Sequence, residues 1–457
     1  MPTRRQTLAA LAAAPFAASP LSAGAQDQSE AEIGVALFSL FMRDTDGFEA
    51  GMRTLSEYGQ ADIASSLIFA LRFSPHDQEK IVALLSEVTG GSGPADWFDW
   101  MLWQERNPIP SHAAFYDIKR RLFLNIEPRW GTFLRPEYIA DGAMDIRFEE
   151  VAWGGVRRDG IPSLDNPTLI EAGEADYLRD QDLVFGVSIN GDARAYPLRI
   201  MGWHEMFNEV IGGVPVALAY CTLCGAGILF ETTVDRFDAP LIMSTSGFLY
   251  RSNKLMYDRE TESLWNQFTG EPVSGPLRGS GVALKQRPVA IEPWSAWRER
   301  NPETRVLSVD TGYRRDYGPG VVYNDYFTST ELMFPAVAGG SLGKKEYVFG
   351  VRAPGGQKAW PLTAFEGGRA INDRVGLQDL VLIGDASGRT ARAYEREGLD
   401  FDFVDARTLR GDGQAWRVTE EALVGEDGRS LPRVAGHVAY WFAWNNYLGS
   451  RAELWEE

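Results

Sequence analysis

A repeat in the second half of the chain constrains its fold more than any other feature. The segment VFGVSINGDARAYPL begins at Val184 and the segment VFGVRAPGGQKAWPL begins at Val348, so they align without a gap at an offset of 164 residues. Both segments are β-rich, and Asn190-Gly191 between two such runs is a strong hairpin signal. The repeat predicts two related β units that pack together.

The chain changes character along its length. Apolar residues recur at three- and four-residue spacing from 30 to 132, which is typical of amphipathic helices. The stretch from Ser74 to Asp77 resembles a cap and first turn, with Pro75 near the first helical position. After these helices, short β-rich runs alternate with Gly, Pro, Asn and Asp. We expect an α+β fold with a helical domain at 30–132, a first β unit at 133–340 and a second, degenerate β unit at 341–457.

Residues 1–25 have the features of an export signal. Arg4 and Arg5 precede an Ala-rich apolar run, and Ala23-Gly24-Ala25 is a small-x-small cleavage pattern. The paired arginines favour the twin-arginine route, and an ordinary secretory signal is the alternative. No segment approaches the roughly 20 apolar residues of a membrane helix. We expect an exported, soluble protein, periplasmic in a Gram-negative cell, with no membrane span.

Charge and missing motifs exclude several classes of function. The formal net charge is −18, and removal of Arg4 and Arg5 leaves about −20. An acidic chain without a basic run is a poor nucleic-acid binder. No phosphate-binding glycine loop leads into an expected helix, and a His-Glu-x-x-His pair is missing from the sequence. Nucleotide-dependent and hydrolase functions are therefore disfavoured, and a small molecule or a metal donor is the expected partner.

The only two cysteines of the chain are Cys221 and Cys224. They follow the apolar run VPVALAY and precede Gly225 and AGILF, which predicts a turn between two strands. A thioredoxin-like site would instead open a long helix. At the repeat offset, neither the cysteines nor His204 have a counterpart in the second copy. A residue set needed to fold the unit should occur in both copies, so this difference favours a function.

Two sulfurs on a Cys-x-x-Cys turn can share a metal or form a disulfide. His204 lies 17 residues before Cys221, at the end of an expected short helix, and is the first candidate for a third ligand. Two thiolates and an imidazole suit copper or zinc, with copper favoured. Glu205 is a candidate for orienting a ligand or acting as a base. Two alternatives stay open: a redox-active dithiol, and a disulfide staple with His204 hydrogen-bonded in the core.

Three segments resemble a bacterial family of exported proteins catalogued as a domain of unknown function. They are WGGVRRDGIPSLDNP, RAYPLRIMGWHEMFNEVIGGVPVALAYCTLCG and SGFLYRSNKLMYDRETESLWNQFTGEPVSGP. They are similar to the family's Arg-Ala-Tyr-Pro, Trp-His-Glu, Tyr-Cys-Pro-Leu-Cys-Gly and Met-Tyr-Asp-Arg motifs. The resemblance covers about residues 151–447 and includes the tail YWFAWNNY. Thr222 replaces the usual proline, which loosens the turn but leaves both sulfurs in place.

The resemblance implies that the family's two cysteines and histidine correspond to Cys221, Cys224 and His204. It adds five candidate pocket residues: Tyr250, Tyr257, Asp258, Arg259 and Trp265. Tyr257 and Glu205 are the candidates for a catalytic role. The alternative is that these pocket residues only pack in a hairpin, where Asp258 and Arg259 form a surface ion pair.

We therefore expect an exported metal-binding protein, a copper- or zinc-dependent oxidoreductase if it is an enzyme. The alternatives are a periplasmic thiol-disulfide oxidoreductase and a non-catalytic metal carrier or structural binding protein.

Overall fold

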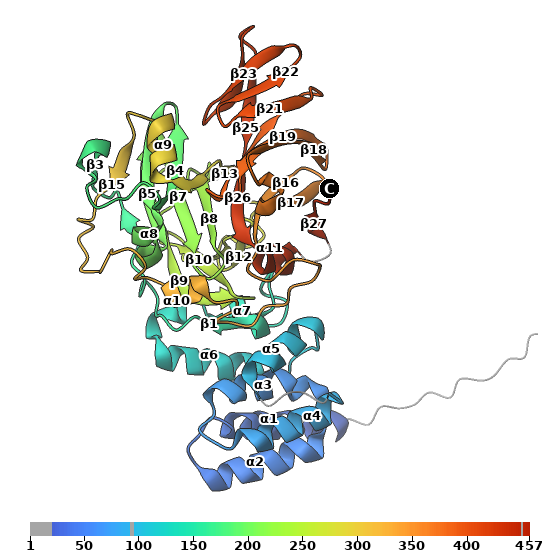
Figure 1. Ribbon diagram of the computed structural model, residues 1–457. Helices are drawn as coiled ribbons and strands as arrows, with labels where there is room; N and C mark the ends of the chain where they lie inside the picture. Colours follow the sequence, from blue (N-terminus) through green and yellow to red (C-terminus); the bar gives the residue numbers. More distant parts are fainter. Residues whose placement is uncertain (1–20, 92–95, 449–450) are drawn as a thin grey trace, which may run out of the picture. The chain divides into compact units, whose positions relative to one another are not determined.

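The computed structural model describes residues 21–91, 96–448 and 451–457. Most of the predicted export signal, 1–25, therefore lies outside the described residues. The chain has an α+β fold, with helices in its N-terminal part and β-sheets in its C-terminal part (Figure 1). No described helix has the length and apolar character needed to cross a membrane.

Two compact units make up the chain. The first comprises the described residues up to 91 with Pro110–Phe115, and the second comprises Asp96–Ile109 with the described residues from Tyr116 onward. The first unit is helical, as its apolar periodicity predicts. Its described helices are α1 (Leu21–Ser39), α2 (Thr45–Tyr58), η1 (Ala61–Ile63), α3 (Ala64–Phe73) and α4 (Gln78–Thr89).

Helix α4 starts three residues later than the sequence suggests. The Asp77 carboxylate caps it by accepting the backbone N–H of Glu79 at 2.9 Å. Because this carboxylate satisfies a free amide of the first turn, the helix begins at Gln78, and the expected start at Pro75 is wrong. The helix ends at Gly90, whose φ of 66° lies in the left-handed region.

Further helices precede the sheets. They are α5 (Trp97–Arg106), α6 (Ala114–Ile126), η2 (Pro128–Thr132), α7 (Pro136–Ile139) and η3 (Phe148–Glu150). The Trp130 indole donates to the Ser246 carbonyl at 2.7 Å and its ring lies 4.4 Å from the Phe248 ring. This end of the helical segment is thereby packed onto a β-strand of the same unit.

The repeated segments fold alike. The first copy contains β4 (Leu183–Ile189), β5 (Asp192–Pro197), α8 (Leu198–His204), β6 (Met206–Ile211), β7 (Val214–Cys221) and β8 (Ala226–Glu231). The second contains β16 (Tyr347–Ala353), β17 (Gly356–Pro361), η5 (Leu362–Phe365), β18 (Arg369–Val375), β19 (Gln378–Asp385) and β20 (Thr390–Glu395). Figure 1 draws the first set mainly in green and the second in orange.

The strand registers also repeat at the same offset. Val184 pairs with Pro197 in the first copy, and Val348 pairs with Pro361 in the second. The hairpin expected at Asn190-Gly191 is confirmed: both residues have positive φ, 51° and 80°.

The likeness continues beyond the aligned segments. Strand β14 (Ala290–Pro293) pairs with β4 and leads into α9 (Trp294–Arg300), while β26 (Gly436–Tyr440) pairs with β16 and leads into α11 (Trp441–Leu448). A Cβ on Gly186 would lie 2.2 Å from the Trp297 ring, and one on Gly350 would lie 2.0 Å from the Trp444 ring. In both copies, an indole from the helix therefore packs directly on a strand glycine.

Each copy carries its own insertion. After β8 the first copy adds β9 (Met243–Tyr250), β10 (Asn253–Asp258), β11 (Leu264–Asn266), β12 (Pro272–Ser274) and β13 (Gln286–Arg287). After β20 the second adds β21 (Phe401–Asp405), β22 (Thr408–Gly411), β23 (Gln414–Val418), β24 (Ala422–Gly425) and β25 (Ser430–Val434). The remaining described elements are β1 (Val151–Trp153), β2 (Leu164–Asp165), β3 (Leu169–Glu171), η4 (Ala172–Glu174), β15 (Arg305–Leu307), α10 (Asn324–Thr328) and β27 (Glu453–Leu454).

Both copies contribute to one hydrophobic core. Phe185 and Leu218 of the first copy and Val351 and Leu382 of the second are buried in the same cluster. Each large apolar side chain that is buried there stabilises the fold by about 1.5–3 kcal/mol, and both copies supply such side chains. A second cluster contains both cysteines, Trp265 and the α11 tryptophans.

Candidate functional site

The two cysteines lie on the predicted turn between two strands. Strand β7 ends at Cys221, and the Cys224 N–H donates to the Cys221 carbonyl at 3.1 Å. Gly225 closes the turn with a φ of 59°, and a Cβ there would lie 3.0 Å from the Tyr347 ring and 3.2 Å from the Tyr440 ring. Backbone conformation and close aromatic packing both favour glycine at this position.

The thiols are close together and buried. Cys221 and Cys224 are free cysteines with 2% and 0% exposure, and Cys221 Sγ lies 2.8 Å from Cys224 Sγ. Cys224 Sγ in turn donates to the Ser252 carbonyl at 3.4 Å. Burial first, and then the hydrogen bond and charge interaction with Cys221, raise the pKa of the Cys224 thiol well above its ordinary range. This thiol is therefore protonated at neutral pH.

A buried ion pair adjoins the cysteine turn. Glu205, the residue after α8, accepts a hydrogen bond from Thr222 Oγ1 at 2.9 Å and one from Lys254 Nζ at 3.1 Å. Both charged side chains are at most 10% exposed. Glu205 raises the pKa of Cys224 and Lys254 lowers it, so the pair lies within electrostatic range of the thiol. The Glu205 carboxylate is thus held in place beside the turn.

A small cavity connects these groups. Its volume is about 50 Å³, and Glu205, Cys221, Lys254, Thr245 and Tyr323 line it. A cavity of this size holds on the order of one to three water molecules. Cys221 and Glu205 can therefore contact the same small molecule.

His204 is bonded elsewhere. It is fully buried, its Nδ1 lies 2.9 Å from the Pro162 carbonyl, and its Nε2 lies 2.7 Å from the Tyr317 hydroxyl. Burial lowers the pKa of this imidazole, which favours its neutral form. Both ring nitrogens thus have oxygen partners, and neither has a sulfur partner within the described residues.

No group of three or more His, Cys, Asp or Glu side chains suited to a metal ion occurs in the described part of the chain. The arrangement gives no support to a Cys221, Cys224 and His204 ligand set. Copper or zinc at this turn stays a prediction.

The other predicted site residues make contacts within the β10–β11 hairpin or with neighbouring segments. Asp258 accepts bonds from Thr261 Oγ1 and from Trp265 Nε1, both at 2.8 Å. Arg259 pairs with Asp165 at 2.6 Å, so the suggested Asp258–Arg259 surface pair is wrong: Asp258 is fully buried and accepts bonds inside the hairpin.

The two remaining tyrosine candidates are also held by neighbouring side chains. The Tyr257 hydroxyl donates to the Asp159 carboxylate at 2.9 Å, and the Tyr250 ring packs edge-on to Tyr447 at 5.7 Å. Neither tyrosine lines the cavity at Cys221 among the described residues.

Sequence reasoning missed Lys254 and the Thr222 contact to Glu205. A signal for Lys254 exists, because it lies in SNKLMYD, a strand whose other residues are mostly apolar or uncharged. Its strand is buried along its whole length. A lysine in such a strand requires a carboxylate partner.

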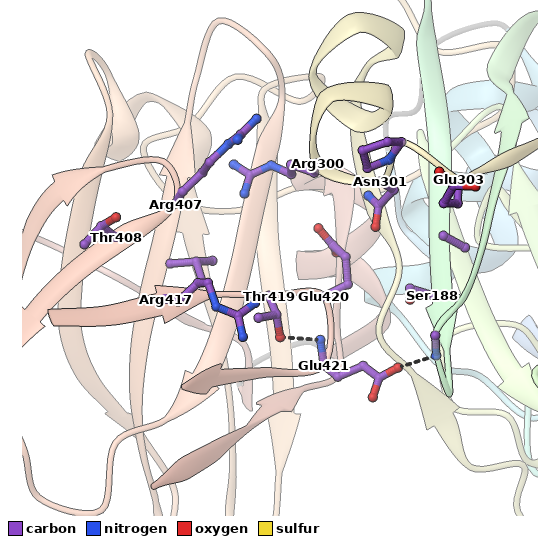
Figure 2. A pocket seen from close by; sticks show the side chains of 14 residues that line it. Ser188, Arg300, Asn301, Glu303, Arg407, Thr408, Arg417, Thr419, Glu420 and Glu421 are labelled. Atoms are coloured by element: carbon purple, nitrogen blue, oxygen red, sulfur yellow. Dashed lines mark hydrogen bonds between the residues drawn. The ribbon is translucent and has the colours of Figure 1, made fainter. Parts of the chain in front are cut away.

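A larger pocket, with a volume of about 650 Å³, lies elsewhere in the second unit (Figure 2). Several of its polar groups already have protein partners. Glu421 accepts the Gly191 N–H at 3.0 Å, Arg407 pairs with Glu299 at 2.7 Å, and Arg300 donates to the Ala406 carbonyl at 2.8 Å. None of the predicted site residues lines this pocket in the described structure.

Comparisons with known proteins agree with the resemblance to a family of unknown function. The family model described as "Protein of unknown function (DUF3179)" matches residues 158–450, which include the cysteine turn and both β copies. No curated protein and no solved structure matches the chain. Since the family model covers more than half of the sequence, the chain belongs to the DUF3179 family of proteins of unknown function.

Proposed function

We propose that Cys221 and Cys224 form a dithiol that is reversibly oxidised to a disulfide, which makes the protein a thiol-based oxidoreductase. The observation that supports this proposal most is the separation of 2.8 Å between the two sulfurs. A disulfide bond is about 2.05 Å long, so closure requires the sulfurs to approach by only about 0.8 Å. The metal prediction lacks a comparable observation, since His204 is bonded to Pro162 and Tyr317.

The surroundings of the sulfurs limit the oxidant. The cavity beside Cys221 is about 50 Å³. A peroxide molecule is only slightly larger than water and fits such a space, whereas a peptide does not. We therefore assign hydrogen peroxide as the class of oxidant that this site favours.

The reaction balances with two thiols and one peroxide. Cys221 Sγ attacks one peroxide oxygen and the O–O bond breaks. One water molecule leaves, and Cys221 becomes a sulfenic acid. Cys224 Sγ then attacks the Cys221 sulfur, the S–O bond breaks, and a second water leaves. Two electrons pass from the sulfurs to the peroxide oxygens. Glu205 is the proposed base that takes the Cys221 proton and returns it to a leaving oxygen.

The test is a peroxide titration of the purified native protein, followed by thiol counting after denaturation and by intact mass. We expect loss of both thiols, a mass decrease of two hydrogens, and no such change in Cys221→Ser or Cys224→Ser. Tyr257→Phe is the matched control, since Tyr257 bonds to Asp159 and does not line the cavity.

Metal analysis of the same samples decides between the proposals. About one copper or zinc per chain, lost in both Cys221→Ser and His204→Ala, would replace the redox proposal with the metal site. Thiols that resist peroxide in a metal-free protein would contradict the proposal and leave a structural role.

A further inference from the structure

A second cavity lies between the two copies of the repeat. Its volume is about 220 Å³. Leu198 and Tyr220 of the first copy line it, together with Tyr347 and Arg389 of the second. The segment around α10 completes the wall with Val322 and Phe327, among others. The walls are thus mainly apolar, with a few polar groups that converge.

Arg389 supplies an uncompensated positive charge. It takes the position of Gly225 in the repeat, with a φ of 53° against 59°. Its Nη1 donates to the Tyr347 hydroxyl at 2.9 Å, and its guanidinium lies 4.4 Å from the centre of that ring. Among the described residues, no carboxylate forms an ion pair with Arg389. The remaining N–H groups are free to bind an anion.

Tyr220 supplies a hydroxyl without a hydrogen-bond partner among the described residues. The residue is only 4% exposed, it lines the cavity, and its hydroxyl forms no hydrogen bond within the described part of the chain. Burial raises the pKa of Tyr220 well above 10, and the charge of Arg389 opposes part of that rise. The phenol is therefore a neutral O–H donor close to a cation. A hydroxyl of a cavity-lining residue that has no protein partner is available to a bound ligand.

The remaining charges in the cavity cancel. Arg199 Nη2 lies 2.8 Å from an Asp182 carboxylate oxygen, and both residues line the cavity. One net positive charge therefore remains, that of Arg389. A single charge beside an O–H donor and apolar walls matches a monoanion with a small apolar body better than a phosphate dianion.

We propose that this cavity binds a small organic monocarboxylate through the Arg389 guanidinium and the Tyr220 hydroxyl. The site is independent of the cysteine proposal. Tyr220 and Cys221 are consecutive in β7, so their side chains point to opposite faces, and they belong to different hydrophobic clusters.

The experiment is calorimetric titration of the full mature chain with benzoate, alongside thermal unfolding. Benzamide has nearly the same shape without the charge, and inorganic phosphate is an anion without an apolar body. We expect benzoate alone to bind the wild type. Arg389→Gln should weaken benzoate binding at least about tenfold, and Tyr220→Phe about three- to tenfold.

Two controls separate binding from folding. Tyr220→Phe removes a hydroxyl with no partner in the described structure, so its unfolding temperature without ligand should equal that of the wild type. Arg410→Gln removes an exposed arginine that lines none of the described pockets, and it should bind benzoate normally. The proposal is overturned if the wild type does not bind benzoate, if benzamide or phosphate binds as well, or if Arg389→Gln binds benzoate unchanged.

Discussion

Removing one member of the Glu205–Lys254 pair should destabilise the protein far more than removing both. The two side chains are 10% and 6% exposed and lie 3.1 Å apart. Glu205→Gln leaves a buried ammonium without its carboxylate, and Lys254→Met leaves a buried carboxylate without its ammonium. Each change should lower the free energy of unfolding by about 3–5 kcal/mol, whereas the double variant should stay within about 2 kcal/mol of the wild type. The resulting coupling energy is about 4 kcal/mol or more.

Urea unfolding of the four proteins, followed by tryptophan fluorescence, measures this coupling. The control cycle is Glu299→Gln with Arg407→Met, an ion pair with a shorter separation of 2.7 Å but with side chains 74% and 50% exposed. Its coupling should stay below about 1 kcal/mol, because water screens it. Additive effects at Glu205 and Lys254, within about 0.5 kcal/mol, would refute the reasoning that burial makes this pair strong.

Three further predictions concern other parts of the chain. Gly350→Ala places a Cβ 2.0 Å from the α11 indole, so it should lower the free energy of unfolding, measured by urea, by about 1–3 kcal/mol. Gly173→Ala is the control, because no atom lies within 4 Å of its Cβ, and it should leave the free energy of unfolding unchanged. Burial lowers the pKa of His437 to about 3, so the unfolded chain takes up a proton that the folded chain does not. The stabilisation that this pKa difference provides is complete above about pH 6.5 and is lost as the pH falls towards 3. Between pH 7 and 5, the free energy of unfolding of the wild type should therefore fall by about 2 kcal/mol more than that of His437→Gln. Because Cys221 and Cys224 are buried, iodoacetamide should label them at least about tenfold more slowly in the native protein than in urea, as measured by mass spectrometry.

Features set by neighbouring residues were readable from the sequence. A two-residue hairpin turn requires positive φ angles, and Asn190 and Gly191 adopt them readily, so this pair predicts the hairpin. The run from VPVALAY through Cys-Thr-Leu-Cys-Gly determines a strand, a tight turn and a second strand. The gapless repeat predicts two similar β units, because both copies keep the same turn positions.

Features set by distant residues were not readable. The partner of His204 is Tyr317, 113 positions later in a segment with little regular secondary structure, and no periodicity indicates that contact. The equivalence of Trp297 in α9 and Trp444 in α11 could not be predicted for another reason. Trp297 and Trp444 are 147 residues apart rather than 164, because the insertions of the two copies differ in length.

The shared core has a consequence for how the chain folds. Phe185 and Leu382 meet in one cluster although almost 200 residues separate them. Contacts of such long sequence separation form slowly, because a large loop must close before the apolar surfaces meet. The first copy therefore leaves the ribosome with one apolar face exposed and completes its packing only after the second copy has been synthesised. During that interval, its uncovered strands are exposed to aggregation.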